Sequence, residues 1–96
     1  MSAGRQRLDK WLWFARFART RSMAARLVTD GHVRINGTRA DAPAKAVHCG
    51  DVLTVAALHG TMLVRVLDLG ERRGPAPEAR LLYADRSAGP SPDDAG

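Results

Sequence analysis

The stretch from residue 7 to residue 37 constrains the fold more than any other part of this chain. Within it, two apolar patterns with helical spacing are followed by Gly31 and then by the pair Asn36-Gly37. An Asn-Gly pair between short apolar segments is the strongest short-range signal for a β-hairpin with a type I′ turn. The sequence therefore predicts two short helices followed directly by a hairpin.

The first predicted helix runs from Arg7 to Ala18. Its apolar residues recur with the spacing of one helix face, so this face should pack on a core. These residues are Leu8, Trp11, Leu12, Ala15 and Ala18. Trp13 and Phe17 fall on the opposite side, where they could form a platform for unpaired bases. We favour the alternative that a later segment covers them, because large exposed apolar patches are uncommon on small domains. The candidate covering residues are Leu81, Leu82 and Tyr83.

The second predicted helix ends near Asp30. Thr20, or alternatively Ser22, can cap its start, because a hydroxyl oxygen accepts a hydrogen bond from a free backbone amide. Gly31 suits the left-handed position that ends a helix. The inward face is expected to consist of Met23, Ala24, Leu27 and Val28.

Two cations break a local rule at the start of this second helix. Arg19 and Arg21 stand where the helix dipole would favour acidic residues. Cations next to free backbone amides form a good pocket for an anion, and such rule-breaking is expected at functional sites. We therefore predict a phosphate site made of Arg19, Thr20, Arg21 and Ser22.

The remaining sequence predicts a small sheet. Strands are expected over residues 32–35, 38–40, 46–47, 52–55 and 61–69, with a loop over 56–60 and a helical turn over 78–84. The strand at 61–69 is apolar on both faces and should be central or covered. We divide the chain into a flexible lead-in (1–6), one domain (7–86) and a tail of disordered composition (87–96).

The positive charge of the chain is confined to its first half. The net charge is +5 over 96 residues. Residues 1–50 hold ten Lys/Arg and three acids, whereas residues 51–96 hold five Arg and seven acids. A one-sided basic domain is typical of proteins that bind phosphate backbones or anionic membranes, and we favour a polyanion over a merely solvated surface.

Other function classes find little support in the sequence. No apolar run approaches the ~20 residues that cross a bilayer, and the first residues lack a signal-peptide pattern, so we expect a cytoplasmic protein. The single Cys49 cannot form an internal disulfide, and we expect it to be buried. No spacing of His, Cys or acidic residues predicts a metal site, a cofactor site or a catalytic group. We therefore expect no enzyme activity and no cofactor.

Two other classes of binding protein stay open. A helix-turn-helix DNA-binding protein would also be basic and have two short helices, although Met23-Ala24-Ala25 offers little for reading a major groove. A protein-interaction module could use Trp13 and Phe17 as its binding hot spot. Competition between duplex DNA and structured RNA would separate the first class from an RNA-binding protein.

Several motifs together resemble the S4 RNA-binding domain over roughly residues 7–55. They are Arg7-Leu8-Asp9, Thr20-Arg21-Ser22, Gly31, Val33-Arg34-Ile35-Asn36-Gly37 and Gly50-Asp51-Val52. Further segments are similar to the family of small bacterial heat-shock proteins that resemble heat-shock protein fifteen. These segments are Asp9-Lys10-Trp11-Leu12-Trp13, Arg72-Arg73-Gly74-Pro75 and Leu81-Leu82-Tyr83.

The resemblance implies an α+β fold in which two N-terminal helices pack on a small antiparallel β-sheet. It also implies a non-catalytic protein that binds structured RNA and associates with the large ribosomal subunit in the rescue of aborted translation. We expect a monomer that does not bind membranes. Carried over to this sequence, the RNA-binding residues would be Arg7, Lys10, Arg19, Thr20, Arg21, Ser22, Arg26, Arg34, Asn36 and Arg39. A long basic C-terminal extension is expected in that family, whereas this sequence ends in a short tail with Pro and Asp residues.

Overall fold

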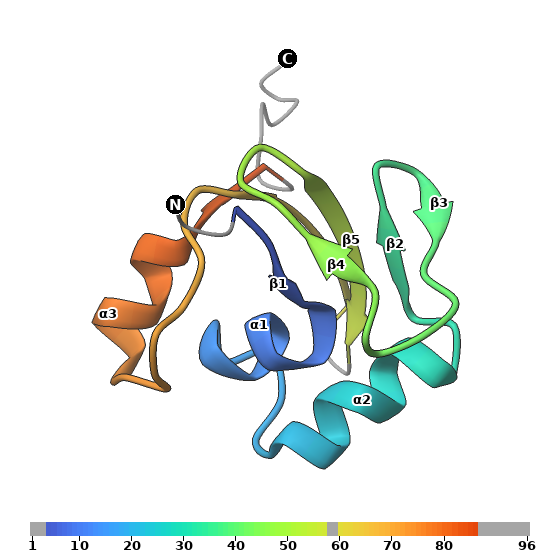
Figure 1. Cartoon of the computed structure of the whole chain (residues 1–96), viewed down its shortest axis with the longest axis horizontal. Coiled ribbons are helices and arrows are strands. Elements are labelled where there is room, and N and C mark those ends of the chain that lie inside the picture. The colour runs from blue at the N-terminus through green and yellow to red at the C-terminus, as the bar shows by residue number, and fades with distance from the viewer. Residues whose placement is uncertain (1–3, 58–59, 87–96) are drawn as a thin grey trace.

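The computed structural model describes residues 4–57 and 60–86, which form an α+β fold (Figure 1). In chain order the elements are β1 (Gln6–Arg7), α1 (Leu8–Phe14), α2 (Arg21–Thr29), β2 (Val33–Ile35), β3 (Thr38–Arg39), β4 (Ala46–Val47), β5 (Val52–Ala57), β6 (Gly60–Val66), α3 (Ala76–Ala79), the 3-10 turn η1 (Arg80–Leu82) and β7 (Tyr83–Asp85). Five strands form an antiparallel sheet in the order β3-β2-β5-β6-β7, and β1 pairs with β4. The predicted fold class is confirmed.

The core lies between the two N-terminal helices and one face of the five-stranded sheet. All five residues of the predicted face of the first helix are buried, and Leu8, Trp11 and Leu12 are completely so. They join one apolar cluster with the inward side chains of the sheet. Figure 1 shows α1 and α2 at the same end of the molecule, with α3 and the β2–β3 hairpin on opposite sides. The sequence periodicity thus predicted correctly which side of α1 is buried.

Helix α1 ends at Phe14, four residues before the predicted end at Ala18. The cause is a left-handed backbone at Arg16, whose φ is 66°. The amide of Phe17 donates to the carbonyl oxygen of Leu12 at 2.9 Å, which is the bond that closes a Schellman motif. Glycine usually occupies this position, so the sequence contained no signal for the early end.

The start and end of α2, and the hairpin after it, follow the sequence prediction. The hydroxyl oxygen of Thr20 caps the helix by accepting a hydrogen bond from the Met23 amide at 3.1 Å. Gly31 ends it in the left-handed region with a φ of 84°. The φ values of Asn36 (51°) and Gly37 (85°) are those of a type I′ turn. One detail was wrong, because Met23 is 49% exposed rather than part of the core.

The sheet differs from the prediction at both ends of its longest strand. Strand β6 is central, as predicted, but it ends at Val66 rather than at Leu69. The amides of Leu67 and Asp68 both donate to the Leu82 carbonyl oxygen, so the chain turns away from the sheet there. Strand β5 extends to Ala57 and β6 begins at Gly60, so three residues of the predicted loop over 56–60 belong to strands. Residues 58–59 of that loop lie outside the described residues.

The C-terminal part of the domain adds a strand that the sequence did not reveal. The predicted helical turn exists as α3 and η1, but residues 83–85 form β7 and pair with β6. Three residues are too few to show the alternating pattern of a strand. Residues 1–3 of the predicted lead-in and the whole tail of 87–96 lie outside the described residues.

Two further expectations need correction. Gln6, which we placed in the flexible lead-in, belongs to β1, and its side-chain amide exchanges two hydrogen bonds with the Gly70 backbone (2.8 and 3.1 Å). Cys49 is exposed rather than buried. The reason is that β4 ends at Val47, so Cys49 lies in the turn that follows the strand instead of on its inward face.

Candidate nucleic-acid interface

The start of α2 presents positive charge and free donors to solvent. The four residues from Arg19 to Ser22 are all exposed, and the first turn of the helix contains no acidic residue. The Thr20 cap satisfies the Met23 amide. Within residues 4–57 and 60–86, no acceptor is found for the amides of Arg21 and Ser22, which are the first two of the helix. These amides and the helix dipole both favour an anion at this end.

A buried carboxylate joins this helix start to the beginning of α1. Asp9 is 4% exposed and accepts two hydrogen bonds from Arg7, through Nε and Nη2, each at 3.1 Å. The Nε of Arg21 lies 3.8 Å from Oδ2 of the same carboxylate, the oxygen that accepts from Nη2 of Arg7. The hydrogen bond and the charge of Asp9 raise the pKa of Arg7 above its ordinary value, so Arg7 stays protonated.

One carboxylate therefore orients two guanidinium groups and neutralises only one charge. The side chains of Arg7 and Arg21 keep 51% and 44% of their surface exposed. A guanidinium has five N–H donors, so both groups retain donors that point to solvent. Asp9 also lies in the first turn of α1, where the helix dipole favours an acidic residue. Its contact with Arg21 depends on tertiary packing, which the sequence does not display.

Two other arginines hold the connection between α1 and α2 in place. The Nε of Arg16 donates to the Gly74 carbonyl oxygen at 2.7 Å, and Nη2 of Arg73 donates to the Ala18 carbonyl oxygen at 3.2 Å. The guanidinium of Arg73 also covers the Trp13 ring at 5.8 Å. These reciprocal bonds join two loops that are more than fifty residues apart, and so they fix the segment that leads into α2.

The aromatic pair on α1 is covered, as we favoured, although by partly different residues. The Phe17 ring packs on Tyr83 with 5.1 Å between centroids, and Trp13 lies under Arg73. Leu81, by contrast, is 71% exposed and covers nothing. The surface of Trp13 and Phe17 is therefore largely occupied within the domain itself.

We expect Arg73→Ala to lower the free energy of unfolding by about 1–2 kcal/mol, since a hydrogen bond and a cation–π contact are lost together. In a domain of this size, this corresponds to a fall in Tm of roughly 4–16 °C. The matched control is Arg72→Ala. Arg72 pairs with Glu78 at 2.8 Å in an exposed position, where such pairs are worth about 0–1 kcal/mol. Equal effects of the two substitutions in thermal unfolding would contradict the role we assign to Arg73.

The structure does not bring all ten predicted RNA-binding residues to one place. Arg26 follows Ser22 by one helical turn on the same exposed face of α2. Lys10 is half-buried, and its ammonium group lies over the Phe14 ring at 5.6 Å. Arg34 and Arg39 face each other across β2 and β3, which is a separate location. The helix group therefore consists of Arg7, Arg19, Thr20, Arg21, Ser22 and Arg26.

Asn36 has a structural use in addition to its place in the hairpin turn. Its side-chain oxygen accepts from the Val52 amide at 2.9 Å, and its side-chain nitrogen donates to Asp51 at 3.2 Å. The Asp51 carboxylate also accepts from the His48 amide at 2.8 Å. These bonds tie the hairpin to the start of β5, and they leave Asn36 fewer free groups for a ligand.

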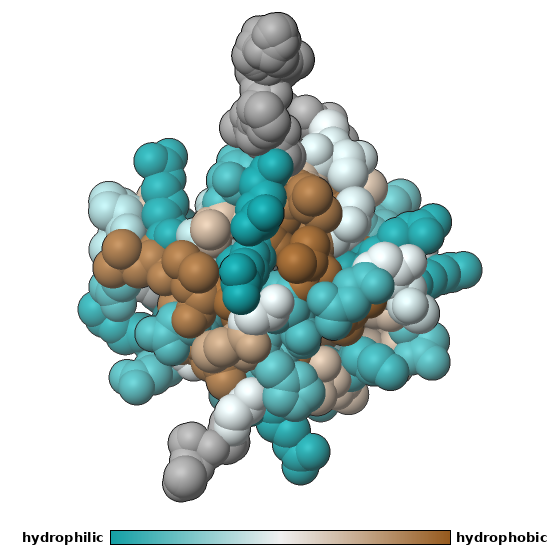
Figure 2. Space-filling view, turned by 90° about the horizontal axis from the view of Figure 1, so that it is seen from above, coloured by the Kyte–Doolittle hydropathy of each residue, from teal (hydrophilic) through white to brown (hydrophobic). Residues whose placement is uncertain are grey.

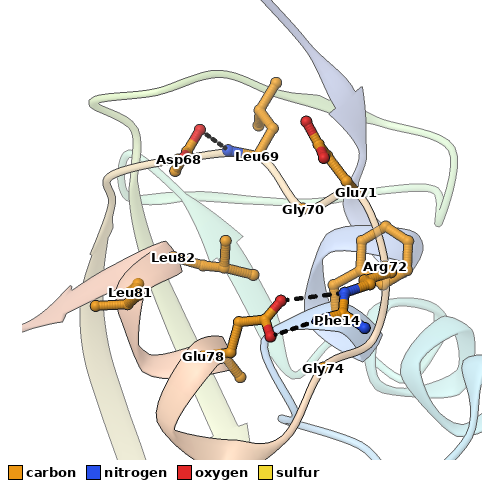
Figure 3. Close-up of a pocket in the computed structure, with 11 residues that line it drawn as sticks. Phe14, Asp68, Leu69, Gly70, Glu71, Arg72, Gly74, Glu78, Leu81 and Leu82 are labelled. Atoms are coloured by element: carbon orange, nitrogen blue, oxygen red, sulfur yellow. Dashed lines mark hydrogen bonds and ion pairs between the residues drawn. The ribbon is translucent and has the colours of Figure 1, made fainter.

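A cavity of about 290 Å³ lies between the 68–74 loop and the α3–η1 segment (Figure 3). Its lining is partly apolar, from Phe14 and Leu82 among others, and partly acidic. The acidic residues are Asp68, Glu71 and Glu78. Figure 3 shows Arg72 and Glu78 paired across its side. An acidic lining does not suit a phosphate, so this cavity is no part of the candidate interface.

The described residues contain neither a candidate metal site nor a candidate membrane span. Among residues 4–57 and 60–86, no three His, Cys, Asp or Glu side chains gather where they could bind a metal ion. None of the helices in this part of the chain has the length and hydropathy that a bilayer span requires.

A comparison with known families identifies the class of protein. The family model of the S4 domain matches residues 6–53, which include both helices, the hairpin and the start of β5. The chain therefore belongs to the S4 domain family. S4 domains are not a known family of enzymes.

Within that family, the chain is similar to heat shock protein 15. It is 46% identical to the heat shock protein 15 homolog of Aeromonas salmonicida over 82 residues, which cover 85% of this chain and 61% of that protein. A solved structure described as trimeric heat shock protein 15 of Vibrio cholerae matches with a TM-score of 0.83 and 39% identity, covering 95% of this chain and 93% of the other.

A second kind of relative is also found. The small ribosomal subunit protein uS4 of Xanthobacter autotrophicus is 38% identical over 72 residues, which cover 73% of this chain and 35% of that protein. The chain spans about three fifths of the length of the curated Aeromonas relative and much less of the uS4 protein.

Proposed function

We propose that this chain is a non-catalytic RNA-binding protein that holds structured RNA by its phosphate backbone. The single observation that carries the proposal is the helix group, in which Arg7 and Arg21 share one buried carboxylate next to the open start of α2. Arg19 and Ser22 extend this surface. Recognition would depend mainly on RNA shape, because side chains cannot read the deep major groove of A-form RNA.

Membership of the S4 domain family and the names of its relatives support the same proposal. Relatives named as a ribosomal protein and as heat shock protein 15 make ribosomal RNA the first candidate target. We further propose association with the large ribosomal subunit during the rescue of aborted translation, which would place the protein in the cytoplasm. The monomeric state that we expect stays a prediction, and sedimentation of the pure protein will test it.

The first experiment is a salt titration of RNA binding. With about four to six phosphate contacts, a plot of log K against log salt concentration should have a slope of roughly −3 to −5, because each contact releases counterions. Fluorescence anisotropy with a labelled ribosomal RNA hairpin would measure it. Duplex DNA of equal length serves as the competitor. A slope near zero, or displacement of the hairpin by DNA at equal concentration, would overturn the proposal.

A further inference from the structure

The five-stranded sheet has a second face that none of the helices within residues 4–57 and 60–86 covers. Strand register places Val33 opposite Val55 and Leu53 opposite Val64, and all four side chains are buried, so they mark the buried face of the sheet. The residues between them in sequence must then point to the other side. None of these outward side chains is buried among those that the structure describes. They include Arg34, Thr54, Val52, Leu63, Arg65 and Ala84.

Four arginines lie on this outward face. Arg34 and Arg39 are directly opposite each other on β2 and β3. Arg65 on β6 lies between Val52 and Ala84, its partners on the neighbouring strands. Arg86 follows β7, and its amide donates to the Leu63 carbonyl oxygen at 2.7 Å, so it continues the cross-strand row of Arg34. All four are exposed.

These arginines have no neutralising partners within residues 4–57 and 60–86. No ion pair or side-chain hydrogen bond is found for Arg34, Arg39, Arg65 or Arg86. Asp51 directly precedes β5, and Asn36 and His48 already engage its carboxylate. Asp85, the last residue of β7, precedes Arg86, but its register partner is Val64, whose side chain points to the buried face. Like charges directly opposite each other destabilise a sheet, so the pairing of Arg34 with Arg39 has a cost. Such a loss of stability is typical of functional sites, where a bound ligand of opposite charge offsets the repulsion.

The surface pattern agrees with this description. In Figure 2, hydrophilic side chains project from the side of the molecule that carries the β2–β3 hairpin in Figure 1. Figure 2 also shows two apolar areas, one on the side of α3 and one near the middle of the view. Among the residues that the structure describes, Leu81 is the most exposed large apolar residue. The hydrophilic side of the hairpin agrees with the exposure of Arg34 and Arg39.

The outward sheet face is not an extension of the helix group, because the two lie on different sides of the molecule. Helix α2 packs on the buried side of the sheet, through Ala24 and Val28, whereas the register places Arg34, Arg65 and Arg86 on the opposite side. Arg39 lies at the edge between the two, with its guanidinium next to Gly31 at the end of α2. Strands lie about 4.8 Å apart, so the row from Arg34 to Arg86 crosses three strand spacings, or roughly 14 Å. A straight RNA helix that lies against the start of α2 cannot also lie across the other side of the sheet.

We propose that the outward sheet face is a second phosphate-binding surface, on which Arg34, Arg39, Arg65 and Arg86 hold another segment of the same folded RNA. The inference rests on the proposed function and deepens it, since the chain would then join two RNA helices rather than bind one. The sequence prediction included Arg34 and Arg39 among the RNA-binding residues, as the cations of the hairpin. Arg65 and Arg86 were not predicted at all.

The test uses the full chain and two RNA probes, a single hairpin and a junction of two hairpins. Arg65→Glu should weaken binding to the junction about 10-fold and make its salt slope less steep by about 1. Binding of the single hairpin, which the helix group can hold alone, should change less than 3-fold. The matched control is Arg80→Glu, which makes the same charge change at an exposed position of η1. It should leave both affinities within about 2-fold.

The outcomes separate this inference from the proposed function. If Arg65→Glu and Arg86→Glu leave junction binding unchanged while substitutions at Arg19 and Arg21 weaken it, the second surface is wrong and RNA binding stands. If none of these substitutions matters, both proposals fail. If Arg65→Glu alters only self-association in sedimentation, the face is a protein interface and the inference is overturned. Circular dichroism would confirm that each variant is folded.

Discussion

Replacing Trp11 with alanine is expected to lower the free energy of unfolding by about 3–5 kcal/mol. Trp11 is completely buried, stacks on Phe17 at 6.0 Å between centroids, and meets the edge of Tyr83 at 6.3 Å. Domains are stable by only about 5–15 kcal/mol, so this loss would unfold a large part of the population. Urea denaturation followed by circular dichroism would measure it.

The control variant for this prediction is Trp11→Phe. Phenylalanine keeps most of the buried ring but cannot replace the indole Nε1, which donates to the Asp68 carbonyl oxygen at 2.9 Å. We expect a smaller loss of about 1–3 kcal/mol, because a part-buried hydrogen bond is lost and a small cavity is left. If Trp11→Ala cost no more than Trp11→Phe, the ring would not be the centre of the core.

The second prediction with a large expected effect concerns the affinity of the protein for structured RNA. The double substitution Arg19→Glu/Arg21→Glu should reduce affinity for a structured ribosomal RNA by roughly 100-fold or more, because two charge-assisted contacts are each worth about 1.5–3 kcal/mol. It should also make the salt slope less steep by about 2. Arg21→Glu also places a second carboxylate beside the buried Asp9, so thermal unfolding of the variant must be measured to separate lost binding from lost stability.

The matched control carries the same change of net charge elsewhere. Arg5 and Arg80 are exposed and belong to neither proposed surface, so Arg5→Glu/Arg80→Glu should retain affinity within a few-fold. Co-sedimentation with purified large ribosomal subunits extends the comparison to the proposed target. Equal losses in both double variants would mean that net charge, rather than the helix group, determines binding.

Local signals predicted much of the fold. The apolar spacing from Leu8 to Ala18 identified the buried face of the first helix, because that periodicity depends on neighbouring residues alone. The Thr20 cap, the Gly31 stop and the Asn36-Gly37 turn are likewise determined by backbone preferences within a few residues. These elements were predicted correctly for that reason.

Features that depend on distant contacts were not predictable in the same way. Arg16 adopts a left-handed backbone although it is not glycine, and its guanidinium bonds to Gly74, 58 residues away. Strand β1 and strand β7 are two and three residues long, so only their partners define them. Their sequences carry no pattern that local reasoning could detect.

In the candidate site, too, features set by neighbouring residues could be predicted, whereas features set by distant contacts could not. Arg19 to Ser22 are consecutive, so their proximity could be read from the chain. The contact of Asp9 with Arg21, and the separation of Arg34 and Arg39 from the helix group, follow from the packing of helices on the sheet. Arg65 was overlooked because it stands alone in an apolar strand, where its direction depends on register.

The loop of residues 68–74 has a consequence for the order in which the molecule assembles. It bonds to Gln6, Trp11, Arg16 and, through Arg73, to the Ala18 backbone. During synthesis on a ribosome, the N-terminal helices emerge long before these partners do. The segment that matches the family model, residues 6–53, therefore cannot complete its packing until the last third of the polypeptide has been made. A nascent chain that stalls before that point would leave the side chain of Trp11 exposed to water.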